Sequence, residues 1–127
     1  MDADERRLNE ITERVIGCAY MVVNTLGHGF LEKVYENALA YELRRCGLAM
    51  EQQKSIKVMY QRIVVGDYVA DLLVEGQVLV ELKTAKSLDD MHVAQCLNYL
   101  KATGIKVCLL LNFGAPKVQV RRIVNQL

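Results

Sequence analysis

The chain has 127 residues, enough for one domain built around a single core. Hydrophobic residues make up 52% of it and charged residues 24%, which is typical of a globular protein and excludes a disordered one. The net charge of +1 excludes a strong global field for nucleic acid, so any such binding has to come from local positive patches. We therefore interpret residues 1–127 as one domain.

Neither a membrane segment nor a disulfide framework is predicted. The longest apolar run, residues 107–111, is far too short to cross a bilayer, and the acidic N-terminal sequence has no signal-peptide character. Cys18, Cys46, Cys96 and Cys108 form no Cys-x-x-Cys pair and stand within apolar patterns. These features predict a cytoplasmic protein whose cysteines are buried free thiols and not zinc ligands.

Two amphipathic helices are predicted at the N-terminal end. Apolar side chains recur at helical spacing over residues 4–25, and acidic residues crowd the first turn, where the helix dipole favours them. A second helix is predicted over residues 31–46, with Gly47 in the usual C-terminal position. The predicted core side of this second helix consists of Leu31, Tyr35, Leu39, Leu43 and Cys46.

Glu32 falls on the apolar side of the second helix, about 20° in projection from Leu39 and from Leu43. One interpretation is an N-terminal glutamate that satisfies the helix dipole. The other is a carboxylate directed inward at a metal site. An uncompensated carboxylate in this position should be destabilising.

The middle of the chain is predicted to form strands. Residues 51–60, 61–65 and 68–74 have strand character, with Gly66 and Asp67 as a turn or bend between the last two. Apolar runs on either side of residues 75–77 predict a hairpin into a strand over residues 78–84.

Three charged side chains interrupt the apolar faces of this hairpin. Side chains alternate along a strand, so Glu81 and Lys83 point the same way. Asp71 on the partner strand faces the same side only across an odd loop, such as residues 75–77, or a bulge. A Glu-x-Lys pair alone is most often ordinary strand surface. Two carboxylates and an amine together can hold a divalent ion beside a cation, which is the equipment for phosphodiester hydrolysis.

In the second half of the chain the sequence pattern predicts a helix and two strands. The helix runs to about residue 102, with N-cap groups among residues 87–90 and Gly104 closing it. His92, Gln95 and Tyr99 share one of its faces, which by itself indicates a polar margin beside a core. Residues 106–112 have the pattern of a buried strand, and residues 118–124 that of a charged edge strand. The core side of the helix is predicted to be Val93, Cys96, Leu97 and Leu100.

Three short motifs carry a family resemblance. Asp71 followed by Glu-Leu-Lys at residues 81–83 resembles the signature of PD-(D/E)XK nucleases, with Ala70 in place of the proline of that name. Residues 29–35, Gly-Phe-Leu-Glu-Lys-Val-Tyr, resemble the motif that names the GxxExxY protein family, which is grouped with these nucleases. Residues 95–99 resemble the Gln-x-x-x-Tyr helix motif found after the catalytic strand in several of their lineages.

The resemblance covers residues 8–124 and implies both a fold and an activity. The implied fold is α/β (α+β) and restriction-endonuclease-like, with a central mixed β-sheet flanked by helices in the order α-α-β-β-β-α-β-β. The implied activity is that of a hydrolase, a metal-dependent nuclease that cuts phosphodiester bonds of DNA, or of RNA, with Mg²⁺ or Mn²⁺.

The resemblance also assigns roles to individual residues. Asp71, Glu81 and the backbone carbonyl of Leu82 would bind the ion. Glu32 would be a further ligand, or would lie behind the ligands and contact the ion only indirectly. Lys83 would orient or deprotonate the attacking water. The residues that would assist this set are Gln95 and Tyr99 beside the catalytic strand and Tyr35 and His92 in supporting positions.

Two other functions stay open from sequence. One is a catalytically silent module of the same fold that binds nucleic acid or assembles with proteins, which the modest charge and small size favour. The other is a metal-dependent hydrolase for a different phosphate substrate. A homodimer is expected, because duplex cleavage needs two active sites or repeated visits and a lone small domain offers little surface for grip.

Overall fold

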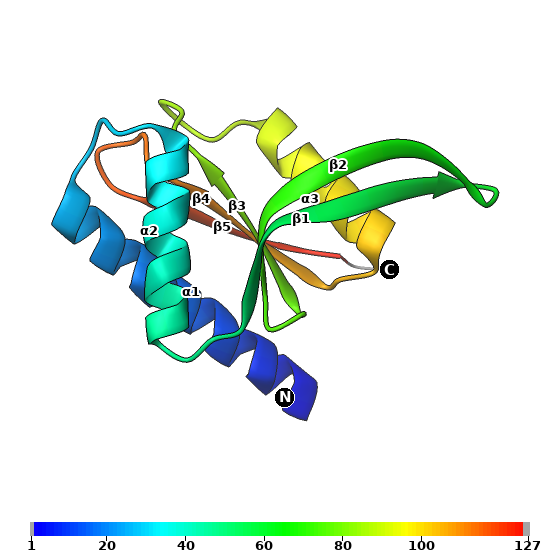
Figure 1. The fold of residues 1–127 in the computed structure, drawn as a ribbon, viewed down its shortest axis with the longest axis horizontal. Helices are drawn as coiled ribbons and strands as arrows, with labels where there is room; N and C mark the ends of the chain where they lie inside the picture. The colour runs from blue at the N-terminus through cyan, green and yellow to red at the C-terminus, as the bar shows by residue number, and fades with distance from the viewer. Residues whose placement is uncertain (1, 126–127) are drawn as a thin grey trace.

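Five strands form one mixed sheet with helices on both faces (Figure 1). The computed structural model describes residues 2–125. The predicted order α-α-β-β-β-α-β-β and the flanked mixed sheet are confirmed. The elements are α1 (Ala3–Leu26), α2 (Glu32–Arg45), β1 (Met50–Tyr60), β2 (Ile63–Val74), β3 (Val78–Lys83), α3 (Asp90–Thr103), β4 (Val107–Asn112) and β5 (Gln119–Val124).

The strands lie side by side in the order β1-β2-β3-β4-β5, which is also their order in the chain. Short connections join β1, β2 and β3 as antiparallel neighbours, and β4 to β5 likewise. β3 and β4 are parallel, because the chain crosses between them through α3. This crossover places the C-terminal ends of β3 and β4 at the same edge of the sheet.

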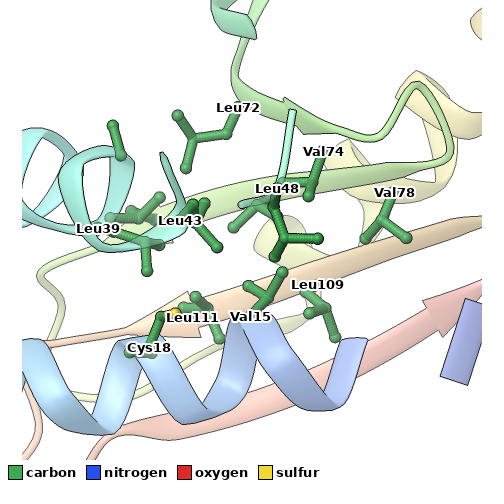
Figure 2. Close-up of a cluster of buried hydrophobic side chains, with 14 of the residues drawn as sticks. Val15, Cys18, Leu39, Leu43, Leu48, Leu72, Val74, Val78, Leu109 and Leu111 are labelled. Atoms are coloured by element: carbon green, nitrogen blue, oxygen red, sulfur yellow. The ribbon is translucent and has the colours of Figure 1, made fainter. Parts of the chain in front are cut away.

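The two faces of the sheet carry separate hydrophobic clusters. α1 and α2 pack on one face, where Val15 and Leu43 meet alternate residues of the central strands such as Leu109 (Figure 2). α3 packs on the other face through Cys96 and Leu100. All six residues of β4 are buried, as its continuous apolar pattern predicts for a strand covered on both sides.

Some predicted core positions are wrong because the helices are shorter or turned differently. Leu31 is the N-cap of α2 and is 78% exposed, since it precedes the first residue with helical geometry. Cys46 is the C-cap of α2 and is exposed, so it is not the buried thiol that was expected. In α3, Tyr99 is buried where Leu97 was expected, because the buried stripe runs through Cys96, Tyr99 and Leu100.

The predicted bend at Gly66 and Asp67 is also wrong. β2 runs without interruption from Ile63 to Val74, and the chain reverses at Gln61 and Arg62, which both have positive φ. Neither residue is a glycine, so this turn carries no strong sequence signal. Gly66 lies within the strand opposite Val58, next to the point where the β1–β2 register shifts.

The β1–β2 hairpin extends well beyond the rest of the sheet (Figure 1). Only Leu72, Leu73 and Val74 of β2 pair with β3, whereas pairing with β1 continues out to Ile63. The outer part of the hairpin is therefore a two-stranded arm beside α3. No helix formed by residues 2–125 is long and apolar enough to span a bilayer.

Candidate active site

The site lies where β2 and β3 separate. The last paired residues are Leu72 and Val80, and the same register puts Asp71 opposite Glu81. The β2–β3 loop contains residues 75–77, so the odd loop length predicted from the sequence is confirmed. Asp71 and Glu81 therefore come together at the first position beyond the ladder.

Each of the two carboxylates accepts a hydrogen bond from the backbone of the facing strand. The backbone N–H of Asp71 donates to Glu81 Oε1 over 2.8 Å, and the backbone N–H of Leu82 donates to Asp71 Oδ2 over 2.8 Å. Because the N–H and C=O of one strand residue point to the same side, the Leu82 carbonyl also faces Asp71. Each carboxylate uses one oxygen to fix its position, and its second oxygen is available to a cation.

Burial makes both carboxylates reluctant to ionise, and negative neighbours add to this effect, Asp71 for Glu81 and Glu36 for Asp71. Burial raises the pKa of Glu81 to about 8, with a further contribution from the negative charge of Asp71. Burial also raises the pKa of Asp71, and the hydrogen bond from the Leu82 N–H offsets only part of this rise. The pair therefore forms a partly buried site in which a bound cation would favour the ionised form of both carboxylates.

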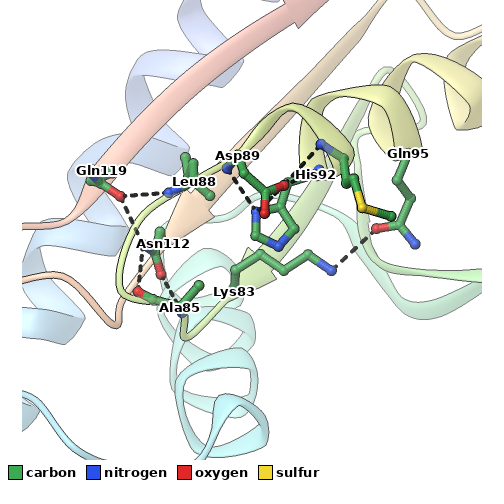
Figure 3. Close-up of polar contacts among 9 residues, drawn as sticks. Lys83, Ala85, Leu88, Asp89, His92, Gln95, Asn112 and Gln119 are labelled. Carbon is green, nitrogen blue, oxygen red and sulfur yellow. Dashed lines mark hydrogen bonds and ion pairs between the residues drawn. The ribbon is translucent and has the colours of Figure 1, made fainter.

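Lys83 is connected to α3 through a relay of hydrogen bonds. Its Nζ donates to Gln95 Oε1 over 3.2 Å, and Gln95 Nε2 donates to the Tyr99 hydroxyl over 3.0 Å (Figure 3 shows the first of these). Burial raises the pKa of Tyr99 to about 12, helped by the negative charge of Glu81. The relay holds the ammonium group beside the two carboxylates.

Glu32, the first residue of α2, belongs to the same electrostatic environment. Burial raises the pKa of its carboxyl, the charge of Asp71 raises it further, and the nearby Lys83 lowers it. An outward-facing N-terminal glutamate would not interact with these residues. However, no group of three or more His, Cys, Asp or Glu side chains within residues 2–125 is arranged to hold a metal ion. The three carboxylates thus do not form a closed metal cage.

One buried carboxylate near the site was missed from the sequence. Glu36, one turn after Glu32, is 3% exposed and accepts hydrogen bonds from Lys33 at 2.8 Å, Gln52 at 2.6 Å and Gln53 at 2.9 Å. Burial opposes its ionisation, but these hydrogen bonds outweigh burial and lower the pKa of Glu36. The available signal was its spacing of one helical turn from Glu32.

The backbone of β1 is irregular beside the site. Gln53 has a φ of 56°, which is uncommon for a residue with a side chain. The β1–β2 register has paired residues on either side of Gln53 and Asp71 but no pair between these two. Such strain is retained where surrounding contacts impose it, here through the bond from Gln53 to Glu36. Because Asp71 is not paired with Gln53 of β1, its backbone N–H is bonded to Glu81 of β3.

Tyr35 and His92 have structural partners. The Tyr35 hydroxyl donates to the Gly27 carbonyl over 2.6 Å, and its ring stacks on Phe113 with centroids 4.8 Å apart. The Tyr35 hydroxyl therefore holds the α1–α2 loop, next to the start of α2. His92 Nδ1 accepts from the backbone N–H of Asp89 in a capping box, and a protonated His92 would lower the pKa of Glu32.

A second network fixes the chain immediately after Lys83. The buried Asn112 accepts from the Ala85 N–H and donates to the Ala85 carbonyl at 3.0 and 2.9 Å (Figure 3). The Phe113 N–H donates to the Lys83 carbonyl over 2.8 Å. Gly114 lies so close that an added Cβ would be 2.5 Å from the Ala85 carbonyl oxygen. The loop after β4 therefore sets the backbone position at the end of β3.

We expect Gly114→Ala to destabilise the protein by about 1–3 kcal/mol, because the added methyl group overlaps with backbone that cannot move freely. Any activity should fall more than the stability loss explains, since the displaced segment directly follows Lys83. Urea denaturation measures the first effect. The matched control is Gly17→Ala in α1, where an added Cβ meets nothing within 4 Å and should be neutral or stabilising. Equal behaviour of the two variants would contradict this account.

The fold and this cluster define a class of protein. In this mixed sheet two neighbouring strands separate around the buried Glu81 and the half-buried Asp71, and Lys83 lies two residues after Glu81 on the same strand. Such an arrangement is suited to phosphodiester hydrolysis. The chain belongs to the PD-(D/E)XK nuclease superfamily, whose family model matches residues 9–123. No curated protein matches the chain.

Solved structures with the same fold include an alkaline exonuclease (LHK-Exo) from Laribacter hongkongensis. It is 15% identical with a TM-score of 0.56, over 74% of this chain and 56% of its own. SSO0001 is 19% identical with a TM-score of 0.56, over 96% of this chain and 61% of its own. The restriction-endonuclease-like fold implied by the sequence is thus confirmed. The chain spans less than two thirds of either structure.

Proposed function

We propose that this protein is a metal-dependent nuclease that hydrolyses phosphodiester bonds of nucleic acid, with DNA as the first substrate to test. The observation that carries the proposal is the pair of carboxylates of Asp71 and Glu81 beside Lys83, each held by a backbone N–H of the facing strand. Superfamily membership supports the same activity. The motif at residues 29–35 supports placement in the GxxExxY group within the superfamily. The free cysteines support a cytoplasmic protein.

The donor set suits a hard divalent cation. Mg²⁺ and Mn²⁺ prefer oxygen ligands, and Mg²⁺ commonly takes one or two carboxylates and retains several waters. Asp71, Glu81 and the Leu82 carbonyl would hold it, which agrees with an open site and not a closed cage. Such an ion would supply activation of water and neutralisation of phosphate charge. The raised pKa values of both carboxylates fit a site built to receive positive charge.

The residues of the chain itself would orient the reactants. The Lys83 ammonium, held by Gln95, would position the attacking water and stabilise the charge that develops on the phosphate. Tyr99 would keep the Gln95 amide in the orientation that Lys83 requires. Glu32 would act on the site through a bridging water, and the buried Glu36 would hold Lys33, Gln52 and Gln53 in place behind it.

The test is incubation with labelled single- and double-stranded DNA and RNA, with Mg²⁺, with Mn²⁺ and with chelator. We expect cleavage that requires the ion and stops with chelator. Cleavage that persists in chelator would contradict the metal dependence. Binding of nucleic acid or of a protein partner with no cleavage under any condition would favour the catalytically silent module.

Replacing Glu32 by glutamine separates its functional role from a structural one. The ion-free variant should melt at the same temperature as the wild type or higher, because a partly buried carboxylate repelled by Asp71 is removed. The rise in melting temperature on adding Mg²⁺ or Mn²⁺ should be smaller, and cleavage should fall. The control is Glu13→Gln on the exposed side of α1, which should match the wild type in all three measurements. A loss of about 0.3–1 kcal/mol with an unchanged metal response would assign Glu32 to the helix dipole alone.

A further inference from the structure

A groove runs between the β1–β2 arm and α3, with a volume of about 940 Å³. Val58, Met59 and Val65 line it from the arm, and Met91 and Asn98 line it from α3. Gln95 and Tyr99 also line it, so the groove opens onto the relay that ends at Lys83. Whatever occupies the groove therefore lies next to the candidate active site.

Tyr68 offers a flat surface within this groove. Its side chain is 51% exposed, and its ring packs on Tyr99 with centroids 5.8 Å apart and an angle of 48°. Tyr99 is in turn held by Gln95. The Tyr68 ring thus packs on the end of the hydrogen-bond relay that holds Lys83, although it lies outside the charged cluster.

Gly66 keeps the floor of the groove open beside this ring. Its φ is not in the left-handed region, so the backbone there does not require glycine. A Cβ added at Gly66 would be 3.3 Å from Tyr68 Cε2 and 3.5 Å from Val58 Cβ. A glycine inside a strand often marks a place where a ligand approaches the backbone closely.

The chemistry of the lining identifies the kind of occupant. Among the groove-lining residues within 2–125, Lys101 is the charged side chain, and the rest are apolar, amide or tyrosine groups. A duplex presents phosphates to a protein and requires several cations. Unpaired nucleobases instead present flat apolar faces that stack on aromatic rings, and edges that accept or donate hydrogen bonds to amides.

We propose that the groove binds the unpaired nucleobases of a single strand, with Tyr68 as the stacking surface and Gln95 and Asn98 near base edges. The adjoining phosphodiester would then lie at Asp71, Glu81 and Lys83. This assignment of a single-stranded substrate rests on the proposed nuclease function. The groove chemistry is common to single-stranded DNA and RNA.

The test is fluorescence anisotropy in chelator, so that binding is measured without cleavage. The probes are labelled oligothymidylate, the matching oligouridylate and a DNA duplex of equal length. We expect the wild-type protein to bind a single strand more tightly than the duplex, and the first two probes report the preferred sugar. Tyr68→Ala should weaken single-strand binding about tenfold, and Tyr68→Phe should retain it, since the ring face is kept.

Gly66→Leu should also weaken single-strand binding, because its side chain fills the groove. Gly17→Leu adds the same atoms to the exposed side of α1, and Tyr41→Ala removes an exposed tyrosine of α2. Both controls should bind like the wild type, and circular dichroism should show all variants folded. Single-strand binding that is unchanged in the folded Tyr68→Ala and Gly66→Leu variants would overturn the proposal.

Sedimentation of the same variants tests whether the groove is instead occupied by a second copy of this chain. A dimer that Tyr68→Ala and Gly66→Leu dissociate, with single-strand binding unaltered, would assign the groove to self-association and also overturn the proposal. The binding assay tests the groove and the cleavage assay tests the nuclease function, so the two proposals can fail independently. Groove-dependent binding without ion-dependent cleavage would refute the nuclease, whereas cleavage without groove-dependent binding would refute only the single-strand site.

Discussion

Lys83→Ala should lower the rate of cleavage by a factor of about 10²–10³ or more while leaving the fold and the metal affinity nearly intact. The Lys83 ammonium is half-buried and is oriented by Gln95 at 3.2 Å, so its charge is fixed where the phosphate charge develops. It contributes no ligand atom to a cation. The loss should therefore appear in kcat, with little change in the melting temperature or in its response to Mg²⁺.

The matched control for this variant is Lys106→Ala. Lys106 is an exposed lysine just before β4, at the opposite end of the sheet from the site. Its replacement removes the same charge from the protein and should leave turnover unchanged. Gln95→Ala provides an intermediate case, because Lys83 would keep its charge but lose its partner. Full turnover in Lys83→Ala would rule out the mechanism as proposed.

The stability of the ion-free protein should fall as the pH rises from about 4.5 to about 8. The pKa of Glu81 is about 8 in the folded protein, above the value of 4.5 for an unperturbed glutamate. In this window the folded protein retains a proton that the unfolded chain has released, so unfolding becomes easier with increasing pH. The slope contributed by Glu81 should reach about 1.4 kcal/mol of unfolding free energy per pH unit. The raised pKa of Asp71 acts with the same sign.

A saturating divalent ion should cancel this pH dependence. It competes with the proton on Glu81, so ion affinity should increase up to about pH 8 and binding should release a proton. Urea denaturation across this range, with and without Mg²⁺, measures both effects. Glu81→Gln should remove the Glu81 contribution to the slope in the ion-free protein, leaving the part due to Asp71, and should weaken the effect of the ion. A slope that is the same in wild type and Glu81→Gln would show that another group is responsible.

The candidate pair Asp71 and Glu81 was accessible from the sequence because it depends on local rules. Side chains alternate along strands, and a three-residue loop fixes which residues face each other across a hairpin. The same locality explains why the periodicity of α1 and the buried pattern of β4 predicted those elements well. Gln95 and Tyr99 were placed by helical spacing, and the structure brings both into the relay from Lys83.

Contacts between distant segments were decided only by the tertiary structure. Glu36 is buried because β1 brings Gln52 and Gln53 to it, and a pattern within α2 cannot show a partner from another element. Tyr35 has the right spacing for the site, yet its hydroxyl reaches the loop before α2. Gly114 shows the same limit, since its lack of a side chain is explained only by Ala85 on another loop.

The sequence by itself therefore determined the elements, their order and the carboxylate pair with its lysine. The turn at Gln61 and Arg62, and with it the arm and the groove beside α3, required the folded chain. The turn was missed because its two positive-φ residues are not glycines, whereas the groove is set by packing between the arm and α3, which are far apart in sequence. Gly66 illustrates this: in isolation it signals a turn, but in the sheet it lies within β2 and leaves space beside Tyr68.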